Sequence, residues 1–172
     1  MNANTIWTGF SAKTVANYLL DLAWRDGVPI DPLKLQKLIY LAHGWSLVLL
    51  RRPLIKEPFE AWNYGPVVPS LYKAFQRFGA SPITELAPKE PMENHYGLDD
   101  RTKSLLDSVW GTYKKLNAIQ LSMFTHEPGY AWDLAQRNGR MSPWGSPRIP
   151  NELIENEFAR REATGRMIQH ER

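Results

Sequence analysis

The chain has 172 residues, of which 43% are hydrophobic and 23% are charged. A chain of this length and composition can bury its own core, so we expect residues 1–172 to form a single domain, with a flexible tail after about residue 164. The sequence has no cysteine, which excludes disulfides, thiolate metal sites and cysteine nucleophiles. Its formal net charge of +3 is spread along the chain without a basic block, which argues against a nucleic-acid partner.

No segment of the sequence has the pattern of a membrane or export signal. The first ten residues, MNANTIWTGF, lack the basic region and the apolar run of a signal peptide. The longest apolar run, residues 38–50, is too short to cross a bilayer. We therefore expect a cytoplasmic protein with no membrane partner.

The first predicted element is a helix at residues 11–26. Val15, Leu19 and Leu22 recur there at helical spacing and form an apolar stripe. Gly27 suits the left-handed position that often ends a helix. A short turn then leads into the next helix.

Residues 31–50 predict a longer helix, with Asp31 as its N-cap and a proline at its first helical position. Apolar residues cover nearly all of its faces, as expected of a helix that other elements surround. Only its first turn is polar, and we expect Lys34, Gln36 and Lys37 to reach solvent there. This helix is the predicted centre of the fold.

The segments that follow are short and rich in proline. Residues 53–55 and 59–62 alternate apolar and polar side chains, which predicts a small β-hairpin or two short strands. A turn is expected at 63–66, and Pro69 opens a helix that ends at Gly79. The predicted buried face of that helix consists of Leu71, Tyr72, Phe75 and Phe78.

The second half of the chain reads as helices separated by loops. The predicted segments are a loop at 81–97, a helix from Asp99 or Asp100 to 116, a short helix from Asn117 to 124, a helix at 130–138, a loop at 141–147 and a last helix from Pro150. The expected fold class is mainly α with a small β-hairpin (α+β), a compact helical domain packed around a central buried helix.

Residues that could carry chemistry are few. The four histidines are His43, His95, His126 and His170, and no two of them have the spacing of a zinc site on one helix. Nucleophile elbows and phosphate-binding loops are also missing. We therefore expect no catalytic residue, no metal and no cofactor, with His43 as a hydrogen-bonded core residue and His126 at a helix end. An enzyme that uses His43 or His126 is the remote alternative.

Aromatic side chains near predicted turns are better candidates for function. Trp62, Tyr64, Tyr130, Trp132 and Trp144 all lie there, and large amphipathic rings often anchor protein contacts. The alternative is that these rings fold back onto the core.

Three motifs resemble those of a known family. They are Lys34-Leu35-Gln36-Lys37-Leu38-Ile39-Tyr40, then Ala61-Trp62-Asn63-Tyr64-Gly65-Pro66-Val67, and then Leu121-Ser122-Met123-Phe124-Thr125-His126 followed by Trp132. In this order they resemble the Panacea antitoxin domain, the SocA-like family that is also described as phage-associated GepA-like proteins. The resemblance runs from the first helix to about Phe158.

The resemblance implies an antitoxin that binds and neutralises a cognate toxin protein. A protease adaptor that delivers the toxin for degradation is the alternative, because one family member acts in that way. A cytosolic protease and a second copy of the chain, as a homodimer, therefore stay open as further partners. The predicted contact surface combines the amino end of the central helix, the 62–66 turn and the 126–132 segment. Its candidate residues are Lys34, Lys37, Trp62, Tyr64, Gly65, Pro66, His126, Tyr130 and Trp132.

Overall fold

The computed structural model describes residues 7–88, 97–141, 143 and 145–165. Within these residues the chain is mainly helical with one small sheet, as the sequence predicts. The α-helices are α1 (Ala12–Asp26), α2 (Pro32–Trp45), α3 (Pro69–Phe75), α4 (Asp100–Tyr113), α5 (Ala118–Thr125), α6 (Ala131–Asn138) and α7 (Asn151–Ala163). His95, Trp144, His170 and most of the expected flexible tail lie outside the described residues.

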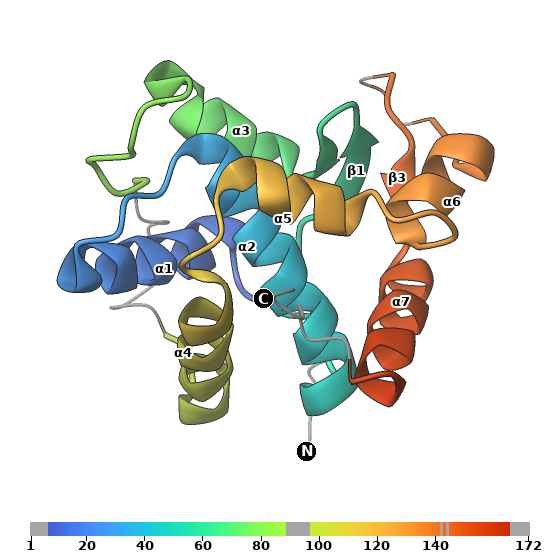
Figure 1. The fold of residues 1–172 in the computed structure, drawn as a ribbon, viewed down its shortest axis with the longest axis horizontal. Coiled ribbons are helices and arrows are strands. Elements are labelled where there is room, and N and C mark those ends of the chain that lie inside the picture. Colours follow the sequence, from blue (N-terminus) through green and yellow to red (C-terminus); the bar gives the residue numbers. More distant parts are fainter. Residues whose placement is uncertain (1–6, 89–96, 142, 144, 166–172) are drawn as a thin grey trace, which may run out of the picture.

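Helix α2 lies at the centre of the molecule, as its apolar faces predict. Figure 1 shows α1 and α4 on one side of it, α6 and α7 on the other, and α5 crossing in front of its first half. The N-cap is confirmed, because the Asp31 carboxylate accepts from the amide of Lys34 at 2.9 Å. Gly44 permits close packing against α7, since an added Cβ would lie 2.2 Å from the Phe158 ring.

The last part of the predicted central helix is not α-helical. Residues Ser46–Leu50 form a π-helical turn (η1), and Arg51 ends it with a φ of 56°. A π-helical turn adds one residue to the turn and shifts the side chains that follow. The buried run nevertheless continues through Val48, so the segment still belongs to the core.

The polar first turn of α2 contradicts the sequence-based expectation. Lys34, Gln36 and Lys37 are all buried, and Lys37 has no exposed surface. Each side chain crosses to another element and donates to a backbone carbonyl there. The acceptors are the carbonyl oxygens of Lys114, Val68 and Pro66, at 2.7, 3.1 and 2.9 Å. These residues fasten α2 to its neighbours and do not face solvent.

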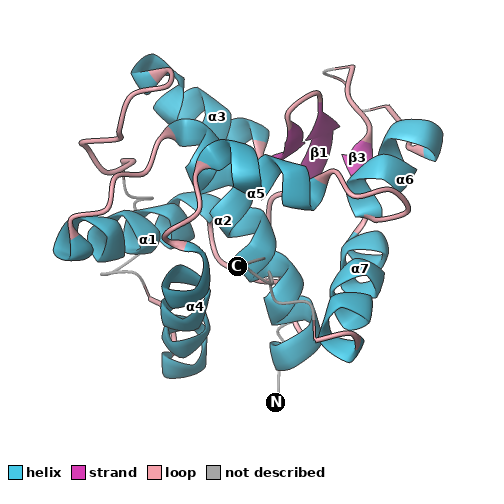
Figure 2. Cartoon of the chain, in the orientation of Figure 1, coloured by secondary structure: helices cyan, strands magenta, loops and turns pink. Residues whose placement is uncertain are grey.

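A small antiparallel hairpin is present, as the expected fold class requires, but its strands are 59–62 and 65–67 and not 53–55 and 59–62. It belongs to a three-stranded antiparallel sheet of order β2-β1-β3, drawn in magenta in Figure 2. Strand β1 is Phe59–Trp62, β2 is Gly65–Val67 and β3 is Arg148–Ile149. The turn is shorter than expected, because Gly65 and Pro66 pair with Trp62 and Ala61 in the ladder. Strand β3 was not expected, since it is only two residues long. Ile55 forms an isolated bridge with Phe10 and belongs to no strand of this sheet.

Most other helix boundaries agree with the sequence. Asp99 caps α4, and Asn117 and Gln120 form the expected capping box of α5. Helix α3 continues as a 3₁₀ turn, η2 (Gln76–Phe78), to Gly79. None of the helices in the described ranges is both long and apolar enough to cross a membrane.

Candidate functional site

The turn of the β1–β2 hairpin is held from one side by helices α5 and α6. Four successive backbone carbonyls, from Ala61 to Tyr64, each face a side chain of these helices. The pairs are Ala61 O with Gln136 Nε2 at 2.6 Å, Trp62 O with Trp132 Nε1 at 2.8 Å, Asn63 O with His126 Nε2 at 3.2 Å, and Tyr64 O with Ser122 Oγ at 3.4 Å. Because α5 and α6 bind the main chain, the side chains of the turn are free to face outward.

Helix α2 holds the second strand of the hairpin through Pro66 and through Val68, the residue that follows the strand. The Gln36 side chain donates to Val68 O at 3.1 Å and accepts from Val68 N at 2.9 Å. Its amide thus pairs with the main chain as a neighbouring strand would. Since β2 is an edge strand, Gln36 and Lys37 together cover an edge that could otherwise pair with another chain.

Gly65 is the point of closest approach between the hairpin and its supports. Its φ is 101°, and an added Cβ would lie 2.8 Å from Lys37 Nζ and 2.9 Å from Thr125 Oγ1. Any side chain here would therefore displace both the strand and the buried lysine.

We expect Gly65→Ala to lower the free energy of unfolding by about 2–4 kcal/mol, through backbone strain together with overpacking. Chemical denaturation would measure this change. Gly27→Ala is the matched control, because Gly27 also has a positive φ of 65° but no atom within 4 Å of the added Cβ. A loss at position 65 no larger than the loss at position 27 would contradict the proposed crowding.

The buried Lys37 ammonium has an unusual electrostatic environment. Burial lowers its pKa from 10.5 to about 7. Among the described residues, its hydrogen-bond partner is the neutral carbonyl of Pro66. The unfolded chain therefore binds this proton more tightly than the folded chain does.

Between pH 7.5 and 9.5, we expect the free energy of unfolding to rise with pH by up to about 1.4 kcal/mol per unit. The sign is positive because only the unfolded state still binds the Lys37 proton in this window. Lys37→Met should remove most of the slope, as denaturation curves across this pH range would show. A wild-type stability that stays flat or falls over this range would contradict the assignment.

The outer side of the hairpin faces a groove of about 460 Å³. Trp62, Tyr64 and Val67 line it from the hairpin, Leu71, Tyr72 and Phe75 from α3, and Leu33 from the start of α2. The Trp62 and Tyr72 rings pack with their centroids 5.0 Å apart. None of the described residues that line the groove is charged.

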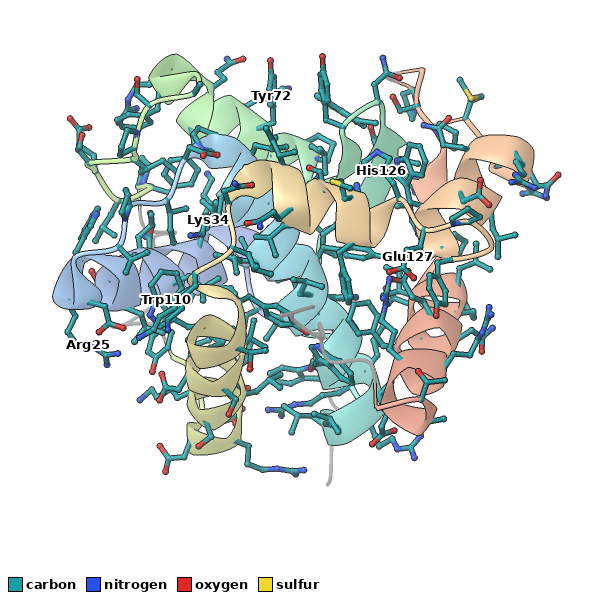
Figure 3. The ribbon with its side chains drawn as sticks, viewed as in Figure 1. Arg25, Lys34, Tyr72, Trp110, His126 and Glu127 are labelled. Carbon is teal, nitrogen blue, oxygen red and sulfur yellow. The ribbon has the colours of Figure 1, made fainter. Side chains whose placement is uncertain are left out.

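Two rings stand out at this groove by their exposure. Tyr64 is 75% exposed and Tyr72 is 45% exposed. Figure 3 shows Tyr72 pointing away from the body of the protein, whereas His126 lies between α5 and the hairpin. On α5, Ile119 and Met123 are also exposed, and they flank Ser122, which contacts the Tyr64 carbonyl. Exposed apolar or aromatic side chains therefore occur on α3, on the hairpin and on α5.

The structure separates the predicted contact residues into two groups. Trp62 and Tyr64 line the groove. The others do not line it: Lys37, Gly65 and Pro66 are buried, His126 and Trp132 contact hairpin carbonyls, Lys34 is buried against the end of α4, and Tyr130 packs on Arg161. The expectation that Lys34 and Lys37 lie at the surface is thus wrong, because their ammonium groups bind carbonyls inside the fold.

Sequence reasoning missed Leu33, Tyr72, Ile119 and Met123. The helical spacing predicts Tyr72 on the buried face of its helix, but α3 buries only Leu71 and Phe75, and the Tyr72 ring packs at a tilt against Trp62 at the surface. For Ile119 and Met123 on α5, the sequence does contain an indication of exposure, since apolar residues occupy nearly every face of this short helix. A short helix of that kind leaves some apolar side chains exposed unless other elements surround it.

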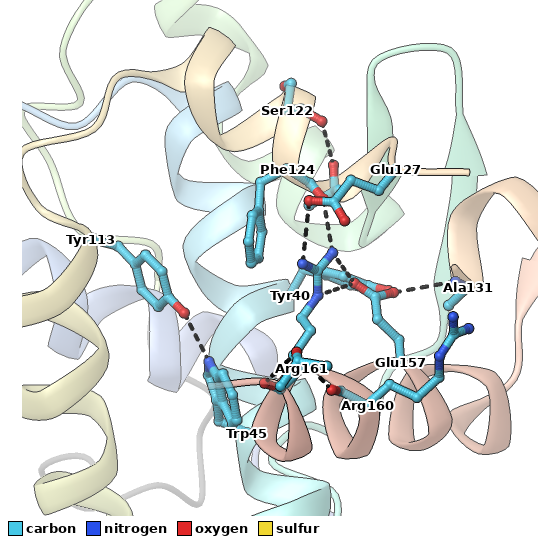
Figure 4. A network of polar contacts seen from close by, with 12 residues as sticks. Tyr40, Trp45, Tyr113, Ser122, Phe124, Glu127, Ala131, Glu157, Arg160 and Arg161 are labelled. Carbon is cyan, nitrogen blue, oxygen red and sulfur yellow. Dashed lines mark hydrogen bonds and ion pairs between the residues drawn. The ribbon is translucent and has the colours of Figure 1, made fainter. Parts of the chain in front are cut away.

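A second polar network fixes the connection between α5 and α6, as Figure 4 shows. The fully buried Arg161 guanidinium lies 2.8 Å from the Glu157 carboxylate and donates to Phe124 O at 2.9 Å. Glu157 also accepts from the Tyr40 hydroxyl at 2.8 Å and from Ala131 N at 3.2 Å. These bonds tie α2, α7 and the ends of α5 and α6 together beneath the hairpin.

His43 is a core residue, as predicted. Its Nδ1 accepts from Ile55 N at 3.3 Å, and its Nε2 lies 2.9 Å from Asn151 Oδ1. Burial lowers its pKa to about 4, so the ring is neutral at physiological pH. Across the described ranges, no three His, Asp or Glu side chains are grouped so that they could hold a metal ion.

Comparison with known proteins assigns the family. The family described as "Antitoxin SocA-like, Panacea domain" matches residues 35–133, which include most of α2, the hairpin, α5 and Trp132. Antitoxin SocA of Caulobacter vibrioides (strain NA1000 / CB15N) is 34% identical over 153 residues, which cover 86% of this chain and 81% of that protein. No solved structure gives a significant match. The chain therefore belongs to the SocA-like antitoxin family and contains its Panacea domain.

Proposed function

We propose that this protein neutralises a partner toxin by binding it directly, and that the toxin contacts the outer face of the hairpin. The family supports an antitoxin role in a toxin–antitoxin system. The observation that carries the proposed surface is the hairpin turn, whose main chain is bound by α5 and α6 while Trp62 and Tyr64 face the groove.

This arrangement has the physical properties of a binding loop. A turn that is already ordered loses little conformational entropy when it binds, so more of the contact energy appears as affinity. Large rings at the centre of an interface contribute much of its binding energy. Because the described residues that line the groove are uncharged, the matching part of the toxin should be apolar. We expect a complex that buries on the order of 1,600 Å².

In this proposal the buried motif residues position the loop. Lys37 and Gln36 fix strand β2, and His126 and Trp132 fix the turn. Their replacement should weaken toxin binding by moving the hairpin. Replacement of the exposed rings should weaken binding while the hairpin stays in place.

Co-expression with the product of the adjacent open reading frame tests the proposal. Growth arrest that this protein relieves, together with co-elution of both chains in size-exclusion chromatography, is the expected result. Relief without a stable complex, accompanied by a falling toxin level, would instead support delivery of the toxin to a cytosolic protease. Full relief by a folded variant that lacks Trp62, Tyr64 and Tyr72 would overturn the surface assignment.

A further inference from the structure

A second groove runs between α6 and α7, away from the hairpin surface. It consists of two adjoining cavities of about 500 and 400 Å³, and both are lined by Leu134 and Leu153. The two helices run side by side in opposite directions. Ala131, at the start of α6, contacts Glu157 in the middle of α7. Gly139, just after α6, and Pro150, just before α7, line the same cavity at the other end of the groove. Figure 1 shows this pair at the edge of the molecule.

Helix α6 separates this groove from the hairpin. Trp132 and Gln136 donate to carbonyls of β1, so one face of α6 is used by the first site. Leu134 lies on another face of the helix and lines both cavities of the second groove. A molecule bound in one groove would therefore leave the other accessible.

Arginines lie at both ends of the α6–α7 groove. Arg140 and Arg148 line one cavity and Arg160 lines the other, and all three are exposed. Within the described ranges, none of the three forms an ion pair. Arg160 instead lies over the Tyr130 ring, 4.9 Å from its centroid. By contrast, the nearby Arg137 is neutralised by Asp133 at 3.0 Å.

Glu60 lies opposite Arg148 in the sheet, but it is buried and accepts from Trp62 Nε1 at 2.8 Å. The groove itself is poor in carboxylates among its described residues. The single acidic residue among its described lining residues is Glu157, which is buried and paired with Arg161. Between the arginines, the lining is largely apolar and includes Leu134, Leu153 and Ala159. The first groove differs in kind, because no charged side chain is found among the described residues that line it.

We propose that the α6–α7 groove binds an acidic segment of a second protein, with carboxylates on the three arginines and apolar side chains on Leu134 and Leu153. Arginine forms bidentate bonds with carboxylates, and two carboxylate sites separated by an apolar floor match an amphipathic peptide. Nucleic acid fits less well, because a phosphate backbone leaves such a floor uncovered. This site would give the protein a second partner beside the one at the hairpin.

Fluorescence anisotropy with the full chain tests this proposal. The probe is a dye-labelled synthetic helix of about 14 residues, four turns, with glutamate on one face and leucine on the other. The comparison probes are the same peptide with lysine in place of glutamate, and single-stranded and duplex DNA oligonucleotides. The site variant is Arg140→Glu/Arg148→Glu/Arg160→Glu. The matched control is Lys56→Glu/Arg101→Glu/Lys115→Glu, which makes the same change in net charge at exposed residues elsewhere.

The acidic peptide should bind, and its affinity should fall at least about tenfold between roughly 50 and 300 mM salt. The site variant should bind it at least about tenfold more weakly than the control variant, because only the site variant loses local charge pairs. Leu153→Ala should weaken binding at every salt concentration. An equal loss of affinity for the acidic peptide in both triple variants would overturn the proposal, as would equal affinity of the wild type for the lysine peptide. Binding of DNA more tightly than of the acidic peptide, with that DNA binding lost only in the site variant, would also overturn it. If the triple variant does not fold, Arg148→Ala against Arg101→Ala provides the same comparison.

Discussion

Replacing Arg161 with alanine is expected to lower the free energy of unfolding by about 3–5 kcal/mol. The guanidinium is fully buried and lies 2.8 Å from the Glu157 carboxylate, which is itself buried. Without it, Glu157 would keep its buried charge with no cation beside it. The Arg161 guanidinium also packs on the Phe124 ring, 3.7 Å from the ring centroid, so the variant would lose this cation–π contact as well.

Arg160→Ala is the matched control, because this neighbour on α7 is exposed and should cost less than about 1 kcal/mol. Arg161→Met combined with Glu157→Gln should recover much of the loss, since the pair is then neutral.

Desolvation already raises the pKa of Glu157, and loss of Arg161 would raise it further. A carboxyl with a raised folded pKa favours the folded state as pH falls, so the deficit of Arg161→Ala should shrink on acidification towards pH 5. If Arg161→Ala lowered the free energy of unfolding by less than about 1 kcal/mol at neutral pH, the assigned role of the pair would be contradicted.

The largest expected effect on function is that of Tyr64→Ala combined with Tyr72→Ala. We expect the toxin complex to weaken by about 3 kcal/mol, roughly a hundredfold in dissociation constant, because two exposed rings at the centre of the proposed interface would be lost. Both side chains are substantially exposed in the free protein, so the free energy of unfolding should change by less than about 1 kcal/mol.

Isothermal titration calorimetry with purified toxin would measure this loss. Leu49→Ala combined with Met141→Ala is the matched control, since it also removes two exposed apolar side chains, and neither of them lines the hairpin groove. The control should bind within about twofold of the wild type, as expected for residues outside the interface. An affinity of the tyrosine variant equal to that of the control would show that the toxin binds elsewhere.

The sequence predicts those parts of the fold that depend on local interactions. Asp31, Asp99 and the Asn117–Gln120 capping box each begin the expected helix, because an N-cap contacts amides only two or three residues away. Alternation also predicts strand β1, but β2 falls largely on the residues expected to form the turn. Strand β3 is not predicted, since its two residues pair with a strand almost ninety residues earlier in the chain.

The polar residues of α2 show why the site could be predicted only in part. Lys34, Gln36 and Lys37 look like a solvated helix face, but their acceptors are carbonyls 80, 32 and 29 residues away. A burial that depends on such distant partners leaves no periodic signal in the helix itself. The resemblance to the family directed attention to the hairpin and to the helices that hold it, yet it could not distinguish residues that position the hairpin from those that face outward. That distinction required the contacts of His126, Trp132 and Gly65.

The most direct test of the central claim is site-specific photo-crosslinking in the toxin complex. A benzophenone amino acid would be placed in turn at positions 64, 72 and 49, and the crosslinked products would be identified by mass spectrometry. We expect toxin adducts from positions 64 and 72 and none from position 49. The three variants must still relieve growth arrest. If only position 49 then gave toxin adducts, the proposal that the toxin contacts the outer face of the hairpin would be contradicted, and the toxin-binding surface would lie elsewhere.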